Sequence, residues 1–292
     1  PAITTAGLTR VFGSGARART VVDRLDLVVP CGVVYGFLGP NGSGKSTTMK
    51  MLLGLLEPTA GSVRLLGQDL TRAARGPLMA RIGSMIERPP GYGHLTGAEN
   101  MRIVQKLLGL SDGQVERALA LVRLNEHRDK LVRAYSLGMK QRLGIAMALA
   151  REPELLILDE PTNGLDPAGI EEIRRLLVEL AGRGVTVMVS SHLLDEIDRM
   201  AGVLGVLSAG RLVFQGTRAQ LMERSVPDML VVTPTRELAQ QIGDVCFTIS
   251  RHTKHFQCTV YGGTKYGPQI SKLKRGVDIL IATPGRLNDL RE

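Results

Sequence analysis

Residues 39–47, Gly39-Pro40-Asn41-Gly42-Ser43-Gly44-Lys45-Ser46-Thr47, decide the fold, because they match the pattern G-x-x-x-x-G-K-[ST]. A nearly continuous apolar run, residues 33–38, precedes them, and a run with helical periodicity, residues 45–55, follows. Glycines let main-chain N–H groups approach an anion closely, and a helix that begins there points the positive end of its dipole at that anion. This order of strand, glycine-rich loop and helix predicts a phosphate-binding loop rather than a chance turn.

The side chains of this loop have separate expected roles. Lys45 is expected to reach the β- and γ-phosphates of a nucleoside triphosphate, and the Ser46 hydroxyl is expected to bind Mg²⁺. The residues that we expect to contact the nucleotide here are Gly39, Asn41, Gly42, Gly44, Lys45, Ser46 and Thr47.

A second buried strand ends in two carboxylates. Residues 155–158 are all apolar and run directly into Asp159 and Glu160. The carboxyl ends of parallel strands lie at one edge of a sheet, so these side chains are expected beside the phosphate loop. Asp159 would hold Mg²⁺, directly or through water, and Glu160 would act as general base on the attacking water. The alternative for such a pair is a solvated strand end.

Strands alternate with helices along residues 1–226. Short strands are expected at residues 3–11 and 25–29, and buried strands at 33–38, 155–158 and 185–189. Leucines recur at helical spacing between about residues 95 and 151, and a further helix is expected at 168–182. This alternation predicts an α/β domain with a largely parallel sheet, into which a helical subdomain of about residues 88–151 is inserted.

The composition is that of a globular chain with a basic surface. Of its 292 residues, 43% are hydrophobic and 22% are charged, which excludes a disordered chain. A formal net charge of +9 permits nucleotides, nucleic acid or an anionic membrane face as partners without choosing among them. The three cysteines form no metal-ligand spacing and no even disulfide set, which favours a reducing compartment. Neither a signal pattern nor an apolar run of about 18 residues is present, so we expect a soluble subunit.

The stretch Tyr135-Ser136-Leu137-Gly138-Met139-Lys140-Gln141 follows the helical region. It resembles the signature loop, usually written L-S-G-G-Q, of the ATP-binding-cassette family. In that family the Ser136 hydroxyl and the bare backbone of Gly138 would face a γ-phosphate. A serine at a helix start is by itself an ordinary N-cap, so the signature gains its weight from the motifs around it.

Other residues resemble further parts of the same family in the expected order. Asn163-Gly164-Leu165-Asp166 resembles the D-loop, and His192 resembles the switch histidine that contacts the γ-phosphate. Phe12 matches the aromatic residue that stacks on adenine. The resemblance covers residues 1 to about 225, and it implies a P-loop NTPase fold of the ATP-binding-cassette type.

The resemblance also implies an ATPase that binds ATP and Mg²⁺ and drives a separate transmembrane permease. Two copies, or one copy and a paired cassette subunit, would face each other head to tail, with each ATP between the Lys45 loop of one chain and the Ser136 loop of the other. Such a subunit works in the cytoplasm, peripherally on the inner face of the cell membrane. The implied catalytic residues are Lys45, Glu160 and His192, the implied metal ligands are Ser46 and Asp159, and the nucleotide contacts outside the phosphate loop are Phe12, Glu87, Ser136, Gly138 and Asp166.

Glu87 departs from the family pattern. The family carries a glutamine after the strand expected at residues 82–86, and this sequence has Glu87 there. Glutamate at this place resembles a subgroup that handles peptide antibiotics of the bacitracin and lantibiotic type. The resemblance therefore implies an exporter of antibiotic peptides or drugs, and it leaves the substrate open.

Residues 227–292 resemble a different family. The stretch 231–242, Gly262-Gly263 and the stretch 281–287 resemble motif Ia, the following GG motif and motif Ib of a DEAD-box RNA helicase. They imply an incomplete α/β fragment of the first RecA-like domain, read as strand, helix, strand, helix, strand. In such helicases Arg236 and Arg286 would contact RNA phosphates. We place the boundary at residues 224–228, where Pro227 cannot continue a helix.

The sequence leaves alternatives to a transport ATPase. No second phosphate loop and no Asp-Glu-Ala-Asp box accompany the helicase-like motifs, so an inert or chimeric tail is favoured. An RNA-remodelling ATPase that uses this tail is the alternative, and stimulation of ATP turnover by RNA separates the two. A regulatory cassette protein is a third class, but such proteins typically carry two cassettes, and this sequence contains one.

Overall fold

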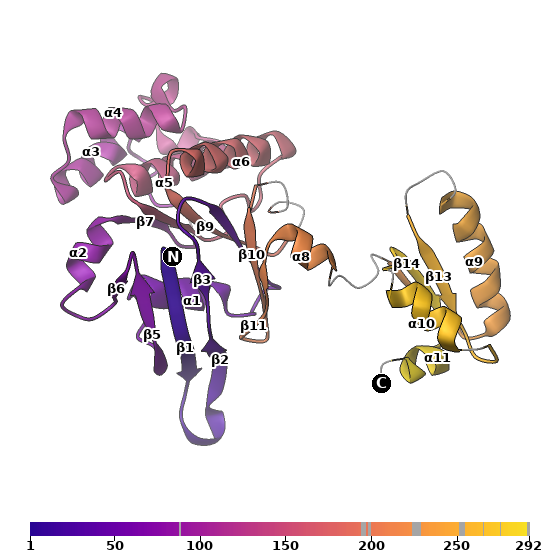
Figure 1. The fold of residues 1–292 in the computed structure, drawn as a ribbon. Helices are drawn as coiled ribbons and strands as arrows, with labels where there is room; N and C mark the ends of the chain where they lie inside the picture. The colour runs from indigo at the N-terminus through magenta and orange to yellow at the C-terminus, as the bar shows by residue number, and fades with distance from the viewer. Residues whose placement is uncertain are drawn as a thin grey trace. The chain divides into compact units, whose positions relative to one another are not determined.

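The computed structural model describes two compact units, Pro1–Arg218 and Ala219–Glu292 (Figure 1). The boundary expected at residues 224–228 lies outside the described residues. Within the described part of the chain, no helix combines the length and the apolar character that crossing a membrane requires. The described residues are 1–87, 89–193, 197, 200–223, 229–250, 255–264, 266–274 and 276–290.

A six-stranded sheet forms the centre of the first unit. Its strand order is β11-β10-β4-β9-β8-β7, in which every neighbouring pair is parallel except β10 with β11. All five residues of β4 are buried, because this apolar strand lies inside the sheet with both faces covered. The bounds are β4 Val34–Leu38, β7 Ile82–Met85, β8 Leu155–Leu158, β9 Thr186–Ser191, β10 Val203–Ser208 and β11 Arg211–Gly216.

A second, antiparallel sheet has the order β2-β1-β5-β6, with β3 paired to β1. Instead of one strand at residues 25–29, the chain forms β2 and then β3. The polar residues on the exposed face of β2 hide its strand character in the sequence, and pairing with β1 stabilises it. The bounds are β1 Ile3–Phe12, β2 Arg19–Leu25, β3 Val28–Val29, β5 Ala60–Leu65 and β6 Gln68–Asp69.

One hydrophobic core joins both sheets to helix α1 (Lys45–Leu52). It contains Leu8 and Leu65 from the antiparallel sheet, Phe37 from β4 and Met49 from α1. The shared core therefore holds α1 against both sheets, just beyond the loop that follows β4. Helices α2 (Arg75–Ala80) and α6 (Pro167–Gly182) complete the main part of the unit, and α8 (Arg218–Glu223) begins at its end.

The helical subdomain consists of α3 (Gly97–Leu108), α4 (Asp112–Leu121) and α5 (Leu137–Leu149), which gather at one end of the first unit (Figure 1). Capping boxes start α3 and α4, at Thr96 and Ser111. Helix α5 lies directly against β7, because a Cβ on Gly144 would stand 2.5 Å from the Met85 sulfur. The prediction of an α/β fold with an inserted helical subdomain is confirmed.

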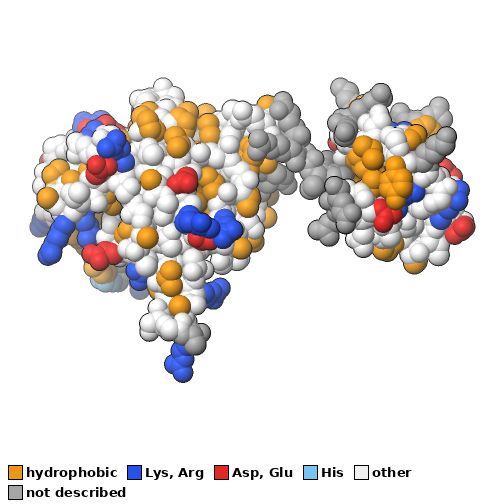
Figure 2. Space-filling model, turned by 60° about the horizontal axis from the view of Figure 1, so that its bottom comes forward, with side chains coloured by type: hydrophobic (Ala, Val, Ile, Leu, Met, Phe, Trp, Pro, Cys, Tyr) orange, Lys and Arg blue, Asp and Glu red, His pale blue; other side chains and the backbone are white. Residues whose placement is uncertain are grey.

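The second unit is a three-stranded parallel sheet of order β12-β14-β13 with a core of Cys258, Val260, Leu280 and Ala282. Its edge strand β12 exposes about half of Met229, Leu230 and Val232, and Figure 2 shows apolar side chains gathered on one face of this unit. The bounds are β12 Met229–Val232, α9 Arg236–Ser250, β13 Gln257–Val260, α10 Tyr266–Lys274, β14 Ile279–Ala282 and α11 Pro284–Asp289.

Candidate functional site

The loop between β4 and α1 has a backbone that only glycine permits at several positions. Gly42 and Gly44 have φ of +79° and +108°, in the region that side chains disfavour. A Cβ on Gly39 would stand 2.4 Å from the Leu207 carbonyl oxygen, and a Cβ on Gly44 would stand 2.7 Å from that of Val21. The loop is therefore packed tightly against its neighbours. It leads into the first turn of α1, whose main-chain N–H groups lack partners within the helix.

Lys45 is buried at the first position of α1, with 5% of its surface exposed. Its Nζ donates to the carbonyl oxygens of Gly39, at 2.8 Å, and Pro40, at 3.4 Å. The Oε1 atom of Glu160 lies 3.4 Å from the same Nζ. A buried ammonium group is stable only when oxygens surround it, and here main-chain carbonyls and one carboxylate supply them.

Ser190 of β9 links the two carboxylates that follow β8. Its Oγ donates to Asp159 Oδ1 at 2.6 Å and accepts from the main-chain N–H of Glu160 at 2.9 Å. Asp159 is 6% exposed, and Glu160 has a φ of +46°, an uncommon value for a residue with a side chain. Sequence reasoning missed Ser190, whose signal was its place on the strand directly before His192.

The second oxygen of Glu160 also has partners. Asn163 Nδ2 donates to Glu160 Oε2 at 3.1 Å, and His192 Nδ1 lies 3.3 Å from the same oxygen. Glu160 therefore contacts Lys45, Asn163 and His192 at once, which brings the three residues expected to be catalytic into one cluster. Asn163 stood in the D-loop motif, but it was not expected to bind at the site.

A cleft of about 430 Å³ opens beside this cluster. It brings together four of the predicted site residues, namely Ser46 from α1, Glu87 after β7, and both carboxylates after β8. Residues of the signature helix and of the D-loop also line it. The complete lining is Ser46, Glu87, Pro89, Leu137, Gln141, Asp159, Glu160 and Asn163.

Glu87 lies at the open side of this cleft. Its carboxylate is 65% exposed and pairs with the Lys50 ammonium group on the last turn of α1. The hydrogen bond from Lys50, and after it the attraction of its charge, lower the pKa of Glu87 below its ordinary value. The residue that replaces the family's glutamine is therefore an anion at neutral pH.

The predicted contacts in the signature and the D-loop are not part of the cleft lining. Ser136 caps α5 by accepting from the Met139 N–H at 3.2 Å, and Asp166 caps α6 by accepting from the Gly169 N–H at 3.1 Å. Both caps are exposed, and Gly138 lies close by on the first turn of α5. In this single chain the serine has the ordinary N-cap geometry.

Two contacts join the signature to the D-loop. A Cβ on Gly164 would stand 3.1 Å from Leu137 Cδ2, and one on Gly138 would stand 3.8 Å from Leu165 Cδ2. The first turn of α5 therefore lies against the D-loop.

Phe12, the expected adenine partner, ends β1 and is 40% exposed. The Arg10 guanidinium lies 4.6 Å from the centroid of its ring. The ring is therefore partly covered by a cation and partly open to solvent. Phe12 does not line the cleft, so the adenine contact would lie apart from the carboxylates.

The residues present fit a nucleotide with Mg²⁺. The Ser43 Oγ atom in the phosphate loop is buried and has no hydrogen-bond partner, which suits a loop that receives an anion. Ser46 and Asp159 offer one hydroxyl and one carboxylate to the same cleft. Among the described residues no group of three or more His, Cys, Asp and Glu gathers around a metal position. Mg²⁺ commonly keeps water and phosphate oxygens as its other ligands, so this sparse donor set suits it.

In the second unit, the expected RNA contact of Arg286 is not available. Arg286 is 5% exposed, its Nε and Nη2 donate to the carbonyl oxygens of Tyr261 and Thr264, and its guanidinium stacks on Tyr266 at 3.8 Å. The guanidinium braces the loop at residues 261–264 instead of facing solvent, which favours the inert tail over an RNA contact at this residue. Arg236 is exposed and lies 5.0 Å from the centroid of the Tyr261 ring.

Comparisons with known proteins agree with the assignment of the first unit as an ATP-binding cassette. The ABC transporter family profile matches residues 22–163, and the DEAD/DEAH box helicase profile matches residues 211–292. The chain is 46% identical to the bacitracin transport ATP-binding protein BcrA of Bacillus licheniformis over 287 residues, 96% of this chain and 92% of that protein. It is 43% identical to the lantibiotic transport ATP-binding protein SrtF of Streptococcus pyogenes over 197 residues, 68% of this chain and 84% of that protein.

A solved structure of the ATP-binding subunit of an ABC transporter has the same fold, with a TM-score of 0.65 at 30% identity over 77% of this chain and 93% of that one. The phosphate loop, the strand-end carboxylates and this level of identity over nearly a whole relative agree with one another. The chain therefore belongs to the ABC transporter family, as one of its ATP-binding, ATP-hydrolysing proteins.

Proposed function

We propose that this chain is the ATPase of an exporter of antibiotic peptides or drugs, and that it works as a head-to-tail dimer on a separate permease. The observation that carries the proposal is the cluster of Lys45, Glu160 and His192 beside a cleft that also contains Ser46 and Asp159. The similarity to proteins named for bacitracin and lantibiotic transport supports the substrate class.

ATP binding begins at the phosphate loop. Main-chain N–H groups of residues 39–47 and the first turn of α1 hold the phosphates, and the Phe12 ring stacks on the adenine. Lys45 turns from the carbonyl oxygens of Gly39 and Pro40 to the β- and γ-phosphates. Bound Mg²⁺, held by Ser46 and Asp159, supplies charge neutralisation at the phosphates. Ser190 keeps Asp159 in place through its hydrogen bond.

Hydrolysis then depends on Glu160. In the structure this carboxylate lies near Lys45. The phosphates compete for Lys45, and its departure leaves Glu160 free to accept a proton from a water molecule. The water oxygen bonds to the γ-phosphorus, the bond to the oxygen that bridges the β- and γ-phosphorus atoms breaks, and ADP leaves with that electron pair. His192 and Asn163 hold Glu160 in position through its second oxygen.

The second half of each ATP site comes from a partner cassette. Ser136 and Gly138, at the exposed start of α5, contact the γ-phosphate bound by the other chain, and Asp166 lies beside them on the neighbouring helix. Because these residues do not line the cleft of their own chain, a single chain has only half of each site. Binding of ATP therefore drives dimer closure, and hydrolysis reopens the dimer.

Closure of the dimer moves the permease through contacts that Glu87 and the helical subdomain make with it. Glu87 lies between the cleft and solvent, so it is placed to respond to the nucleotide and to contact another protein. The working place of such a subunit is the cytoplasmic face of the cell membrane, beside the permease.

Residues 1–226 form the cassette domain, and residues 227–292 form a separate domain derived from the first RecA-like domain of a DEAD-box helicase. The helicase profile and the three parallel strands of the second unit support this origin. The alignment with the bacitracin transport protein covers 96% of the chain, so it also extends over most of this domain. The domain takes no part in ATP hydrolysis, because every catalytic residue lies in the first unit.

The export proposal is tested in cells. Bacteria that are sensitive to bacitracin receive the permease of a bacitracin exporter together with this chain, either unchanged or as Glu160→Gln. We expect the minimum inhibitory concentration of bacitracin or of a lantibiotic to rise only with the unchanged chain. Equal sensitivity of both strains to a panel of peptide antibiotics and drugs contradicts export, while ATP turnover of the purified chain still tests the ATPase.

A further inference from the structure

Gln141 on α5 has a buried side chain with an unsatisfied oxygen. The residue is 5% exposed and lines the cleft that contains Ser46, Asp159 and Glu160. Its Oε1 atom is shielded from solvent and accepts no hydrogen bond. A buried amide oxygen without a donor costs free energy, so its retention in this cleft points to a state in which a donor arrives.

Two other polar side chains of the cleft lining, Asn163 and Glu87, do not take this place. Asn163, the second amide of the lining, already donates to Glu160. Glu87, which stands where the family has glutamine, is exposed and paired with Lys50. Asn163 is exposed, so Gln141 is the amide of the lining whose oxygen is both buried and without a donor among the described residues.

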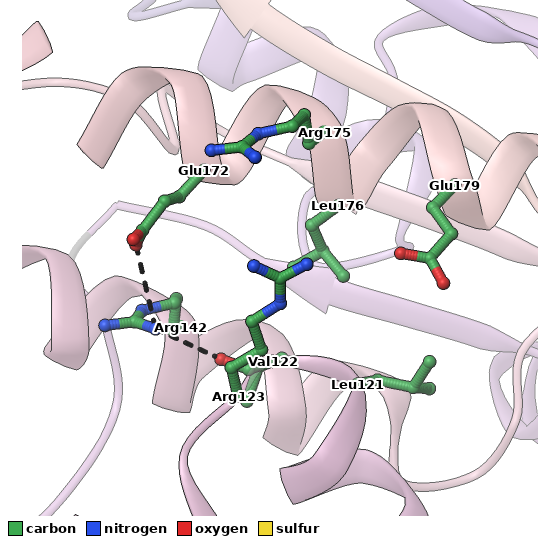
Figure 3. A pocket seen from close by; sticks show the side chains of 8 residues that line it. All are labelled: Leu121, Val122, Arg123, Arg142, Glu172, Arg175, Leu176 and Glu179. Atoms are coloured by element: carbon green, nitrogen blue, oxygen red, sulfur yellow. Dashed lines mark hydrogen bonds and ion pairs between the residues drawn. The ribbon is translucent and has the colours of Figure 1, made fainter. Parts of the chain in front are cut away.

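An adjacent side of α5 is held by Arg142, which limits rotation of the helix and of Gln141 with it. The next residue, Arg142, projects about 100° further around the helix. Its Nη1 donates to the Val122 carbonyl oxygen at 3.4 Å and lies 3.7 Å from Glu172 Oε2 on α6 (Figure 3). Arg142 thus ties α5 both to the end of α4 and to α6.

The same helix begins at the signature serine. Ser136 caps α5, and Gln141 follows five positions later, about 7.5 Å along the axis. One helix therefore carries both residues. Ser136, at its start, is proposed to contact the partner's nucleotide, and Gln141, just over one turn later, lines the cleft of its own chain.

We propose that Gln141 is a positioning residue that couples the two ATP sites of the dimer. Its amide oxygen accepts a hydrogen bond from a water molecule that enters the cleft with the nucleotide. This bond fixes α5, and with it the signature serine, only when the chain's own site is filled. The inference rests on the proposed head-to-tail dimer, and it adds a connection from each site to the opposite one.

The test replaces the amide without changing the length of the side chain. Gln141→Met removes the unsatisfied oxygen, so we expect the nucleotide-free chain to unfold at the same temperature as the wild type or at a higher one. We expect the KM for ATP to stay within about twofold and kcat to fall about tenfold, the loss of one hydrogen bond of about 1.4 kcal/mol. The Hill coefficient of ATP hydrolysis should fall toward 1, and the rise of Tm caused by saturating ATP should shrink.

Gln105→Met on α3 is the matched control, since Gln105 donates to Asp112 on the surface, away from the cleft. We expect it to leave kcat and the Hill coefficient unchanged. A lower Tm together with a lower kcat in Gln141→Met means that the glutamine only supports the fold. An unchanged kcat in this variant means that the amide oxygen has no role. Either result overturns the proposal. A wild-type chain without ATP turnover contradicts the proposed function instead, and the Tm measurements with and without ATP still test Gln141.

Discussion

Glu160 Oε1 lies 3.4 Å from Lys45 Nζ, so the cation of the phosphate loop and the carboxylate after β8 partly neutralise each other. Lys45 comes from α1 and Glu160 from the end of β8, two segments that the parallel sheet brings to one edge. The contact joins the side chain that we propose to bind the phosphates to the one that we propose as general base. Each of the first two predictions removes one partner of this pair.

Glu160→Gln should leave ATP binding intact and trap a dimer. The amide has nearly the shape of the carboxylate but cannot take up a proton, and loss of a general base costs on the order of 10²–10⁴ in rate. ATP turnover and sedimentation velocity, with and without ATP, check both parts. Wild-type turnover in this variant means that another group serves as the base.

Lys45→Ala should abolish nucleotide binding, whereas Ser136→Ala should spare binding to the single chain and lower turnover. Lys45 serves the nucleotide of its own chain, and Ser136 serves that of the partner. A mixture of the two variants forms one intact composite site in a fraction of the dimers, so its turnover should exceed that of either variant alone. If the mixture only gives the sum of its parts, the shared-site arrangement is wrong.

Ser190→Ala should lower both stability and turnover. The Ser190 hydroxyl is buried and bonds Asp159 Oδ1 and the Glu160 N–H, so the variant leaves a buried donor and a buried carboxylate without a partner. Such a loss costs about 1–3 kcal/mol of unfolding free energy. Urea unfolding and ATP turnover are measured beside Ser208→Ala, an exposed serine at the end of β10, which should change neither. Unchanged turnover in Ser190→Ala shows that Asp159 and Glu160 keep their positions without it.

The sequence was most informative where a function depends on local pattern. Residues 39–47 specify the phosphate loop by themselves, since the glycines needed at positive φ stand next to the lysine and the serine that chemistry requires. The run of residues 155–158 is likewise the strand β8, because an apolar tetrapeptide before two carboxylates has few other places in a folded chain. Here local residue types were enough.

Other features depend on contacts between distant segments. The place of Ser190 before His192 is a weak signal, and its importance follows from the pairing of β8 with β9, which sets its hydroxyl beside Asp159. Arg286 is the opposite case, because its motif is associated with phosphate contacts, while the fold buries it against the carbonyl oxygens of Tyr261 and Thr264. Side-chain direction in the folded chain decides both cases.

Deleting residues 227–292 should leave ATP hydrolysis within about twofold of the full chain, because Lys45, Glu160 and His192 all lie in the first unit. The deletion should also improve solubility, since it removes the edge strand β12 with its exposed Met229 and Leu230. Turnover of both chains and light scattering at increasing concentration measure these two effects. A shortened chain that does not fold shows that the second unit stabilises the first.

Single-stranded RNA should not stimulate ATP turnover of the full chain at physiological salt. Arg286 is committed to main-chain carbonyl oxygens, so among the two arginines expected to touch RNA only Arg236 is exposed. Any remaining affinity of this unit for RNA comes from general attraction between basic side chains and phosphates, which weakens steeply as salt rises. Turnover is measured with and without RNA at several salt concentrations, in the wild type and in Arg236→Ala.

Arg286 is a poor position for the same experiment, because its replacement would release the loop at residues 261–264. A several-fold stimulation that persists at physiological salt and disappears in Arg236→Ala would make the chain an RNA-dependent ATPase, since general phosphate attraction cannot produce a response that depends on one side chain.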